Sequence, residues 1–153
     1  MRNRPSRKIF ELILEWAVIP TFDLVLEVRG KGIIMVRRKI VPYKDQWALP
    51  GLRIYKGETI NDTLRRIAKQ ELGIIIDPRK KILLGQYVGK FKTEHQRQDV
   101  STGYLISLDQ KTFRKIDYNK ERFSEMRVAK NFPGRAGAMY SYYLKLWKTS
   151  SKN

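Results

Sequence analysis

Residues 47–74 constrain the fold more than any other part of this 153-residue chain. Thr59 has the side chain of a helix N-cap, and Asp62, three residues later, completes a capping box. Gly73 fits the left-handed position that follows a helix end. The segment between Thr59 and Gly73 is therefore predicted to form one capped helix.

The predicted helix carries a carboxylate on its apolar face. Its apolar residues recur at the spacing of one helical face, and they are Ile60, Leu64, Ile67, Ala68 and Leu72. At 100° per residue, Glu71 falls about 20° from Ile60 on the helical wheel. A carboxylate facing a core is costly unless it is paired, hydrogen-bonded or bound to a metal. Glu71 is therefore predicted to face a cation or a basic group, and the alternative is that it turns to solvent from the last helical turn.

The same stretch resembles a Nudix box, whose usual pattern is G-x5-E-x7-R-E-U-x-E-E-x-G-U, with U apolar. The matching residues are Glu58, Arg66, Glu71, Gly73 and Ile74, after a similar lead-in, Trp47-Ala48-Leu49-Pro50-Gly51. Three positions depart from the pattern, because Leu52 replaces the first glycine and Ile67 and Gln70 replace metal-binding glutamates. An ordinary Nudix hydrolase without these two carboxylates would hold Mg²⁺ poorly.

One branch of that family, the GDP-mannose mannosyl hydrolases, shows the same kind of loss. Its box resembles Arg66-Ile67-Ala68-Lys69-Gln70-Glu71-Leu72-Gly73. Further similar features are Asp23 at the start of an apolar strand, Arg38, Arg53, Gly85-Gln86-Tyr87-x-Gly89 and Asp99-Val100-Ser101-Thr102-x-Tyr104. The resemblance covers residues 18–147 and implies an α/β fold, a Nudix-like α/β/α sandwich around a mixed β-sheet.

The resemblance also implies roles for individual residues. Glu71 and the backbone carbonyl of Gly51 would bind Mg²⁺, or Mn²⁺ in its place, with diphosphate oxygens of the substrate completing the coordination. Glu58 would support the metal-binding loop without contacting the metal. Arg38 and Arg53 would neutralise the diphosphate leaving group, because one guanidinium group can donate two parallel hydrogen bonds to phosphate oxygens.

The substrate contacts and the general base complete the expected site. Asp23 and Asp99 would contact the base or the sugar of the substrate. In the resembling branch a late loop supplies a glutamine for the metal and a histidine as base, and here Lys120 and Glu121 fall near those positions. A protonated lysine cannot bind a metal, whereas Glu121 can act as a general base. His95, the only histidine, is the other candidate for the base.

The predicted reaction is Mg²⁺-dependent hydrolysis of a nucleotide sugar, GDP-mannose or a related GDP-sugar. Water would attack the anomeric carbon, and GDP and the free sugar would be released. The metal would then mainly neutralise the leaving group, which tolerates fewer carboxylate ligands. One alternative is pyrophosphate hydrolysis at phosphorus, with Glu121 or Glu94 restoring metal ligands. Another is a catalytically weak protein that binds nucleotides or RNA, which the altered box positions suggest.

The charge of the chain favours anionic partners. There are 32 Lys and Arg against 15 Asp and Glu, which gives a formal net charge of +17. A nucleic-acid patch would concentrate these residues together with aromatic ones, but here they are spread along the chain. A solvated basic surface and a nucleic-acid role therefore both remain open, and both agree with a small phosphorylated substrate.

Other features of the composition indicate a single cytoplasmic domain. Cysteine is absent, so disulfides and thiolate metal sites are excluded. No apolar run approaches the ~20 residues that span a bilayer, and Glu11 and Glu15 interrupt the apolar N-terminal segment, unlike in a signal peptide. We expect one domain over residues 1–148 and a disordered tail over residues 149–153.

The order of elements predicted from the sequence is that of an α/β protein. Strands are expected at residues 22–28, 32–36, 82–88, 101–108 and 126–128, and a last helix carries the stripe Ala136, Met139, Tyr140, Tyr143, Leu144 and Trp147. Residues 6–17 are predicted to form a helix that is apolar nearly all round. Such a helix must be buried. Within the N-terminal segment 1–20, the interface of a homodimer is one natural place for it.

Overall fold

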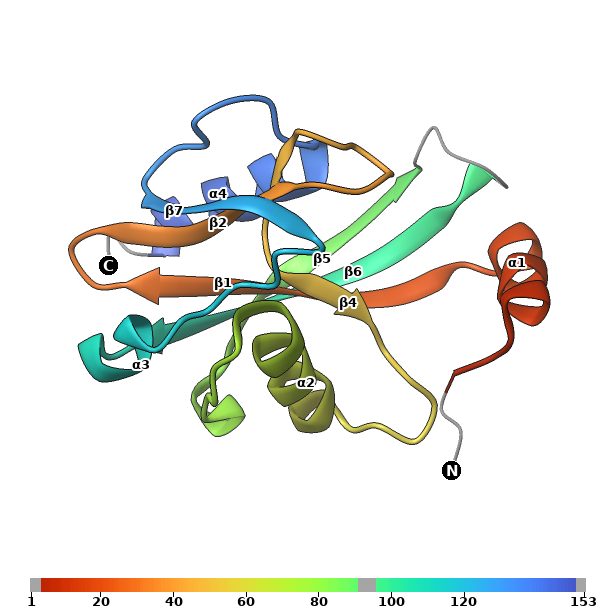
Figure 1. The fold of residues 1–153 in the computed structure, drawn as a ribbon, viewed down its shortest axis with the longest axis horizontal. Helices are drawn as coiled ribbons and strands as arrows, with labels where there is room; N and C mark the ends of the chain where they lie inside the picture. Colours follow the sequence, from red (N-terminus) through yellow and green to blue (C-terminus); the bar gives the residue numbers. More distant parts are fainter. Residues whose placement is uncertain (1–3, 91–95, 151–153) are drawn as a thin grey trace.

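The computed structural model describes residues 4–90 and 96–150, and it has a mixed β-sheet between two layers of helices (Figure 1). The strands are β1 (Ile19–Val28), β2 (Gly32–Arg38), β3 (Trp47–Ala48), β4 (Gly51–Arg53), β5 (Ile82–Lys90), β6 (Gln98–Leu108) and β7 (Phe123–Ala129). The helices are α1 (Arg7–Trp16), α2 (Ile60–Leu72), α3 (Gln110–Arg114) and α4 (Ala138–Ser150), and η1 (Pro78–Lys80) is a short 3₁₀ helix.

The strand order of the sheet is β3-β2-β1-β6-β5, with β4 paired to β1 and β7 paired to β2. Strands β1 and β6 are parallel, and the other pairs are antiparallel. Strand β4 pairs with the first part of β1, where Gly51 lies opposite Asp23, whereas β2 pairs with its end at Glu27 and Val28. Strand β1 thus meets two different strands along its length, and β4 brings the loop before α2 next to Asp23.

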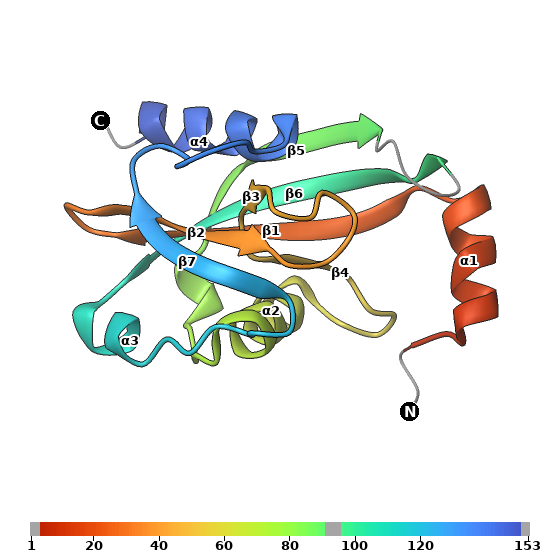
Figure 2. The same cartoon turned by 45° about the horizontal axis from the view of Figure 1, so that its top comes forward.

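Two apolar layers cover the faces of the sheet. Alternate residues of β1, among them Leu24 and Leu26, pack with α2 residues such as Leu64 and Ile67. Val25, on the opposite face, belongs to the layer formed with α4. Figure 2 shows α4 on one side of the sheet and α2 on the other. The predicted α/β/α sandwich is confirmed.

Most of the predicted elements are present, with differences at their ends. Strand β7 is longer than the predicted strand 126–128, because it pairs with β2 from Ile33 to Arg38. Helix α3 was not predicted from the sequence. It begins after its N-cap Asp109, whose carboxylate accepts a hydrogen bond from the Thr112 backbone N–H (2.6 Å). Helix α4 continues through Ser150, so Thr149 and Ser150 are helical and do not belong to a tail. Residues 151–153 lie outside the described part of the chain.

The N-terminal helix is not buried within this chain, and its predicted burial in the interface of a homodimer stays a prediction. No residue of α1 is buried, and Trp16 is 82% exposed. The physical reason is its position beyond the end of the sheet, where neither helical layer covers it (Figures 1 and 2). Phe10 of α1 contacts Arg53 of β4, and the Arg53 Cζ atom lies 4.2 Å from the centre of the Phe10 ring. The apolar side chains Ile9, Leu12 and Trp16 are left exposed.

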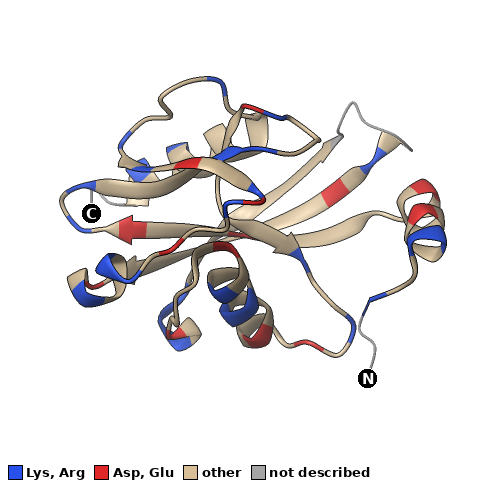
Figure 3. Cartoon of the chain, viewed as in Figure 1, with Lys and Arg blue, Asp and Glu red and all other residues tan. Residues whose placement is uncertain are grey.

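The basic residues are distributed over nearly all elements of the fold (Figure 3). They occur on both helical layers, on the strands and on the loops between them, without a single concentration on one element. Within residues 4–90 and 96–150, none of the helices has the length and apolar character needed to cross a membrane.

Candidate active site

Helix α2 has both predicted caps. The Thr59 hydroxyl accepts a hydrogen bond from the Asp62 backbone N–H (3.1 Å), and the Asp62 carboxylate accepts one from the Thr59 N–H (3.0 Å). Gly73 ends the helix at φ 65°, in the left-handed region. These caps set the ends of the helix, its apolar face packs on the sheet, and Glu71 is 0% exposed, as its place on that face predicted.

At the start of α2, Glu58 and Arg66 form a closely bonded ion pair. Arg66 Nε donates to Glu58 Oε2 (2.7 Å) and Arg66 Nη2 donates to Oε1 (2.8 Å). Glu58 also accepts hydrogen bonds from the Tyr55 N–H (2.7 Å) and the Thr63 hydroxyl (3.3 Å). The hydrogen bonds from Arg66 lower the pKa of Glu58 despite partial burial. Because Arg66 Nη2 also donates to the Arg53 carbonyl (2.7 Å), this pair ties strand β4 to α2.

At the other end of α2, Glu71 faces Arg122. Arg122 Nε lies 3.0 Å from Glu71 Oε1 and 3.3 Å from Oε2. Only the contact with Oε2 has hydrogen-bond geometry, so the buried Oε1 lacks a hydrogen-bond partner among the described residues although it is the nearer oxygen. Burial raises the pKa of Glu71, and the Arg122 charge opposes that rise. Arg122 is thus the basic group opposite Glu71.

The loop before β7 docks on the end of α2 and carries Arg122 into place. The backbone N–H of Asn119 donates to the Glu71 carbonyl (2.9 Å), and that of Asp117 donates to the Leu72 carbonyl (3.0 Å). These are carbonyls that the helix itself leaves without partners. The backbone of Arg122 is held on both sides, because its N–H donates to the Asn119 carbonyl (3.2 Å) and its carbonyl accepts from Lys39 (2.8 Å).

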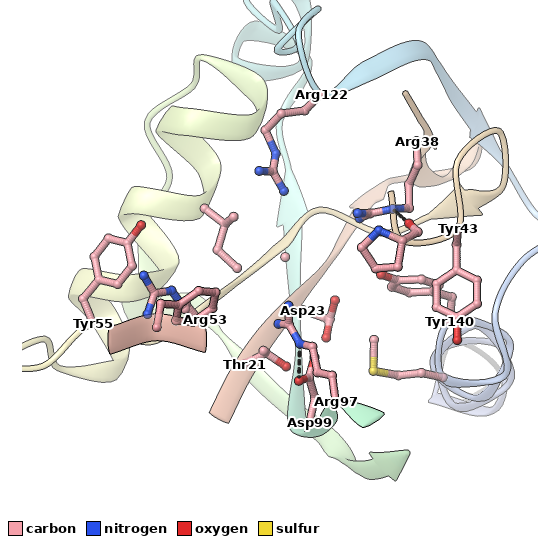
Figure 4. Close-up of a pocket in the computed structure, with 15 residues that line it drawn as sticks. Thr21, Asp23, Arg38, Tyr43, Arg53, Tyr55, Arg97, Asp99, Arg122 and Tyr140 are labelled. Carbon is pink, nitrogen blue, oxygen red and sulfur yellow. Dashed lines mark hydrogen bonds and ion pairs between the residues drawn. The ribbon is translucent and has the colours of Figure 1, made fainter. Parts of the chain in front are cut away.

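A cavity of about 250 Å³ lies beside this pair, where β1, β2 and β4 meet the start of β6. Its lining includes five of the residues that the sequence analysis selected, namely Asp23, Arg38, Gly51, Arg53 and Asp99. Figure 4 shows the side chains of Asp23, Arg38, Arg53 and Asp99 approaching the cavity from different elements. The fold therefore brings together residues that are up to 76 positions apart in the sequence, counted from Asp23 to Asp99.

Four arginines line this cavity, and they differ in their partners. Arg122 pairs with Glu71, and Arg97 Nε donates to Asp99 (2.8 Å). Arg38 Nε instead donates to the Pro42 carbonyl (2.6 Å), and the Arg53 guanidinium lies between the Phe10 ring (4.2 Å) and the Tyr55 ring (5.1 Å). Neither Arg38 nor Arg53 forms an ion pair with a carboxylate of the described residues. Two guanidinium groups therefore face the cavity without a direct ion pair to a carboxylate of the described residues, although the Arg38 charge still acts on Asp23.

Asp23 forms the floor of the cavity and is almost fully buried. Its carboxylate accepts a hydrogen bond from the Ser101 hydroxyl (2.5 Å), which in turn is 2.8 Å from the Tyr143 hydroxyl on α4. Burial raises the pKa of Asp23 to about 7, although the Ser101 hydrogen bond and the Arg38 charge act in the opposite direction. Asp23 is thus positioned to exist in either protonation state near neutral pH.

The family of the chain follows from its sequence as a whole. The sequence profile of the NUDIX domain matches residues 19–132, which is more than half of the chain. The chain belongs to the Nudix family.

Individual Nudix relatives and structures agree with this family. The low-salt glycan biosynthesis protein Agl8 of Haloferax volcanii is 28% identical over 120 residues, which cover 70% of this chain and 72% of that protein. An ADP-ribose pyrophosphatase of Methanocaldococcus jannaschii is 39% identical over 87 residues, 57% of this chain and only 48% of that enzyme. The MutT NUDIX hydrolase of Burkholderia pseudomallei has a similar fold, with a TM-score of 0.71 at 19% identity, covering 84% of this chain and 96% of that one.

Nudix hydrolases generally use divalent metals such as Mg²⁺ or Mn²⁺, and the residues of this Nudix site fit one such ion. Oε1 of Glu71 is a buried oxygen without a hydrogen bond among the described residues. Gly51 lies on the cavity wall, where any Cβ would collide with the Asp23 carboxylate. The described residues contain no group of three or more His, Cys, Asp or Glu side chains that could hold a metal. The protein thus offers few ligands, which suits an ion that shares its coordination with a substrate and water.

Not all the predicted residues of the Nudix site meet at this cavity. Glu121 is exposed and does not line the cavity, and its N–H donates to the Asn119 side chain (3.0 Å). Lys120 pairs with Asp117 (2.8 Å) outside it. His95 and Glu94 lie outside the described residues. The role of Glu121 or His95 as the base therefore stays a prediction.

The structure adds cavity residues that the sequence analysis did not select. They are Phe10, Thr21, Pro42, Tyr43, Leu52, Tyr55, Arg97, Arg122, Met139 and Tyr140. Arg97 could have been found, because it precedes Asp99 by two residues and so falls on the same side of a strand. Arg122 gives no such signal, since its position depends on how a loop docks on α2.

Proposed function

We propose that this Nudix protein hydrolyses a nucleoside diphosphate derivative, and specifically a nucleotide sugar such as GDP-mannose or a related GDP-sugar. The observation that carries the proposal is that Arg38 and Arg53, on a cavity that also holds buried carboxylates, form no direct ion pair with a carboxylate of the described residues. A diphosphate supplies the anion that Arg38 and Arg53 lack, and Asp23 and Asp99 supply hydrogen-bonding partners for sugar or base hydroxyls and amines.

The proposed reaction is attack of water at the anomeric carbon, which releases GDP and the free sugar. Arg38 and Arg53 bind the diphosphate and stabilise the negative charge that develops as it leaves. Glu71 and the Gly51 carbonyl would hold one Mg²⁺, or Mn²⁺ in its place, which would supply further neutralisation of the leaving group. Glu58 keeps β4 against α2 through Arg66 and so holds Gly51 and Arg53 in position.

The general base of the proposed reaction is Glu121 or His95, and mutation separates the two. Glu121→Gln is expected to lower kcat by about 10²-fold, the usual scale for losing a general base, and His95→Asn to change it little. The pH profile gives a second readout. A carboxylate base of ordinary pKa leaves activity flat above about pH 6, whereas a histidine gives a limb near about pH 6.5. An inactive His95 variant with such a limb would assign the base to the 90–98 loop.

Pyrophosphate hydrolysis at phosphorus is the second candidate function. It is favoured by the 39% identity to the ADP-ribose pyrophosphatase, although the matched segment covers about half of that enzyme. A third candidate is a protein that binds nucleotides or RNA with weak catalysis, which agrees with the altered box and the +17 charge. RNA binding would weaken steeply with salt, because phosphate contacts release counterions.

A product screen tests the proposal against both alternatives. Nucleotide sugars, ADP-ribose and dinucleotides are incubated with the protein and Mg²⁺, with EDTA as the control. GDP plus free sugar supports the proposed reaction, and GMP plus sugar phosphate supports the pyrophosphatase. Absence of turnover, with salt-sensitive RNA binding, would contradict both enzymatic functions.

We further infer a homodimer with a cytoplasmic location. Support for the dimer comes from α1, whose apolar residues Ile9, Leu12 and Trp16 are exposed in the single chain. Light scattering on the wild type and on Trp16→Glu tests it. A dimer that dissociates in the variant is expected, and a monomeric wild type would contradict it.

A further inference from the structure

The Arg122 guanidinium occupies the place beside Glu71 that a metal ion would need. Arg122 lines the cavity and contacts Glu71, whereas Glu71 itself is fully buried and does not line the cavity. We propose that Arg122 is an ionic latch on Glu71: it holds the carboxylate in the free protein, and a diphosphate ligand draws it into the cavity so that metal and diphosphate bind cooperatively. The proposal rests on the assignment of Glu71 as metal ligand in the proposed function.

Arg122 and a metal ion would compete for the same carboxylate of Glu71. Arg122 Nε lies within 3.3 Å of both carboxylate oxygens. A divalent ion on the same carboxylate would lie only a few ångströms from the guanidinium. Two like charges at such a distance repel strongly where burial lowers the effective dielectric. The metal therefore binds Glu71 only when the guanidinium leaves.

The side chain of Arg122 is partly exposed, whereas its backbone is held by hydrogen bonds. Its side chain is 32% exposed, in contrast to 0% for Glu71. Hydrogen bonds with Asn119 and Lys39 hold its backbone, and among residues 4–90 and 96–150 its side chain forms one hydrogen bond, to Glu71. Rotation of the side chain thus costs one ion pair and leaves the docked loop in place.

The cavity is the place to which the Arg122 guanidinium moves when it leaves Glu71. Arg38 and Arg53 line the cavity and form no ion pair with a carboxylate of the described residues, so their positive charges disfavour a third guanidinium there in the free protein. A bound diphosphate reverses this, because its charge attracts three arginines and the metal together. If the diphosphate raises the affinity for the metal by a given factor, the metal raises the affinity for the diphosphate by the same factor.

Binding of Mn²⁺ tests the latch without any assay of activity. Free Mn²⁺ is measured by electron paramagnetic resonance at pH 8, with and without GDP, and corrected for the Mn²⁺ that GDP binds in solution. For the wild type, GDP is expected to tighten Mn²⁺ binding by about 5- to 150-fold, the common range for coupled sites. In Arg122→Gln, Mn²⁺ without GDP is expected to bind at least about fivefold more tightly than in the wild type, and the enhancement by GDP to shrink.

Two control variants isolate the role of Arg122. Arg122→Lys keeps a competing charge beside Glu71 and is expected to behave like the wild type. Arg127→Gln makes the same change of charge at an exposed arginine that pairs with Glu125 (2.6 Å) and does not line the cavity, and it is expected to leave Mn²⁺ affinity unchanged. Thermal unfolding verifies folding, and Arg122→Met provides a second neutral variant.

Two results would overturn the latch, and they have different consequences. If Arg122→Gln and Arg122→Met bind Mn²⁺ like the wild type while Glu71→Gln does not bind it, the latch is wrong and the metal site of the proposed function stands. If Glu71→Gln binds Mn²⁺ as well as the wild type, the metal site is wrong and the latch falls with it.

Discussion

Two glutamate–arginine pairs lie at opposite ends of the same helix, and they are bonded very differently. Glu58 and Arg66, at the start of α2, share two short hydrogen bonds, and Glu58 has two further donors. Glu71 and Arg122, at its end, share one hydrogen bond, and the nearer carboxylate oxygen lacks one among the described residues.

The two pairs differ in the same way in their pKa values. Hydrogen bonds from Arg66 lower the pKa of Glu58, whereas burial raises that of Glu71. A pair whose hydrogen-bonding groups are satisfied holds the fold together. A buried carboxylate left partly unsatisfied contributes little to stability, which favours a binding role for it. We therefore propose a structural role for Glu58 and a functional role for Glu71.

The largest effect is expected at Asp23, a buried carboxylate with no ion pair among the described residues. Its pKa in the folded state is about 7, against an ordinary value of 3.8. As pH rises from about 4 to about 7 the unfolded chain releases this proton first, so folding stability is lost over that window and then levels off. At 1.36 kcal/mol per pKa unit the loss is on the order of 4 kcal/mol.

Asp23→Asn removes this titration and tests the expectation. The free energy of unfolding of the variant minus that of the wild type should rise by on the order of 4 kcal/mol from pH 4 to pH 8. Urea unfolding at the two pH values measures it. An equal difference between variant and wild type at both pH values would show that Asp23 does not titrate in this window.

The next effect is on catalysis, through Glu71→Gln. We expect turnover to fall by about 10²- to 10³-fold, the scale for losing one preorganised electrostatic contact. The thermal midpoint should not fall, because the change removes a buried charge whose pKa burial already raises. Steady-state rates and thermal unfolding are measured on the same preparation. Wild-type turnover in this variant would refute the assignment of Glu71.

Glu58→Gln is the opposite test, with a smaller effect. It should lower the free energy of unfolding by about 2 kcal/mol, as expected for hydrogen bonds to a charged partner that lose their acceptor. Turnover well below the melting temperature should stay within about tenfold of the wild type, about 1.4 kcal/mol, because Glu58 does not line the cavity. A loss of activity as large as that of Glu71→Gln, without loss of stability, would erase the distinction between the two pairs.

The smallest effect is expected for Arg53→Lys. Lysine keeps the charge but loses the planar group between the Phe10 and Tyr55 rings and the paired contacts with phosphate oxygens. We expect kcat/KM to fall by about tenfold, about 1.4 kcal/mol, with stability nearly unchanged. A drop in stability with unaltered kinetics would place Arg53 with the structural pair.

The sequence predicted what depends on local signals. The caps of α2, the burial of Glu71 and the convergence of Asp23, Arg38 and Arg53 all follow from helical spacing, strand order and the resemblance. The partner of Glu71 did not follow, because Arg122 reaches it only through the docking of the 117–123 loop on α2. The sequence left open whether its own chain or a second copy covers α1, since an apolar helix does not reveal which partner buries it.

Hydrolysis in ¹⁸O-labelled water tests the central claim most directly. The protein is incubated with Mg²⁺ and the GDP-sugar that it turns over, and the products are analysed by mass spectrometry. The proposed site neutralises a diphosphate leaving group on the anomeric carbon, so the account predicts attack at that carbon, with the label in the released sugar and none in GDP. Label in a phosphate of the nucleotide product would show attack at phosphorus and contradict it.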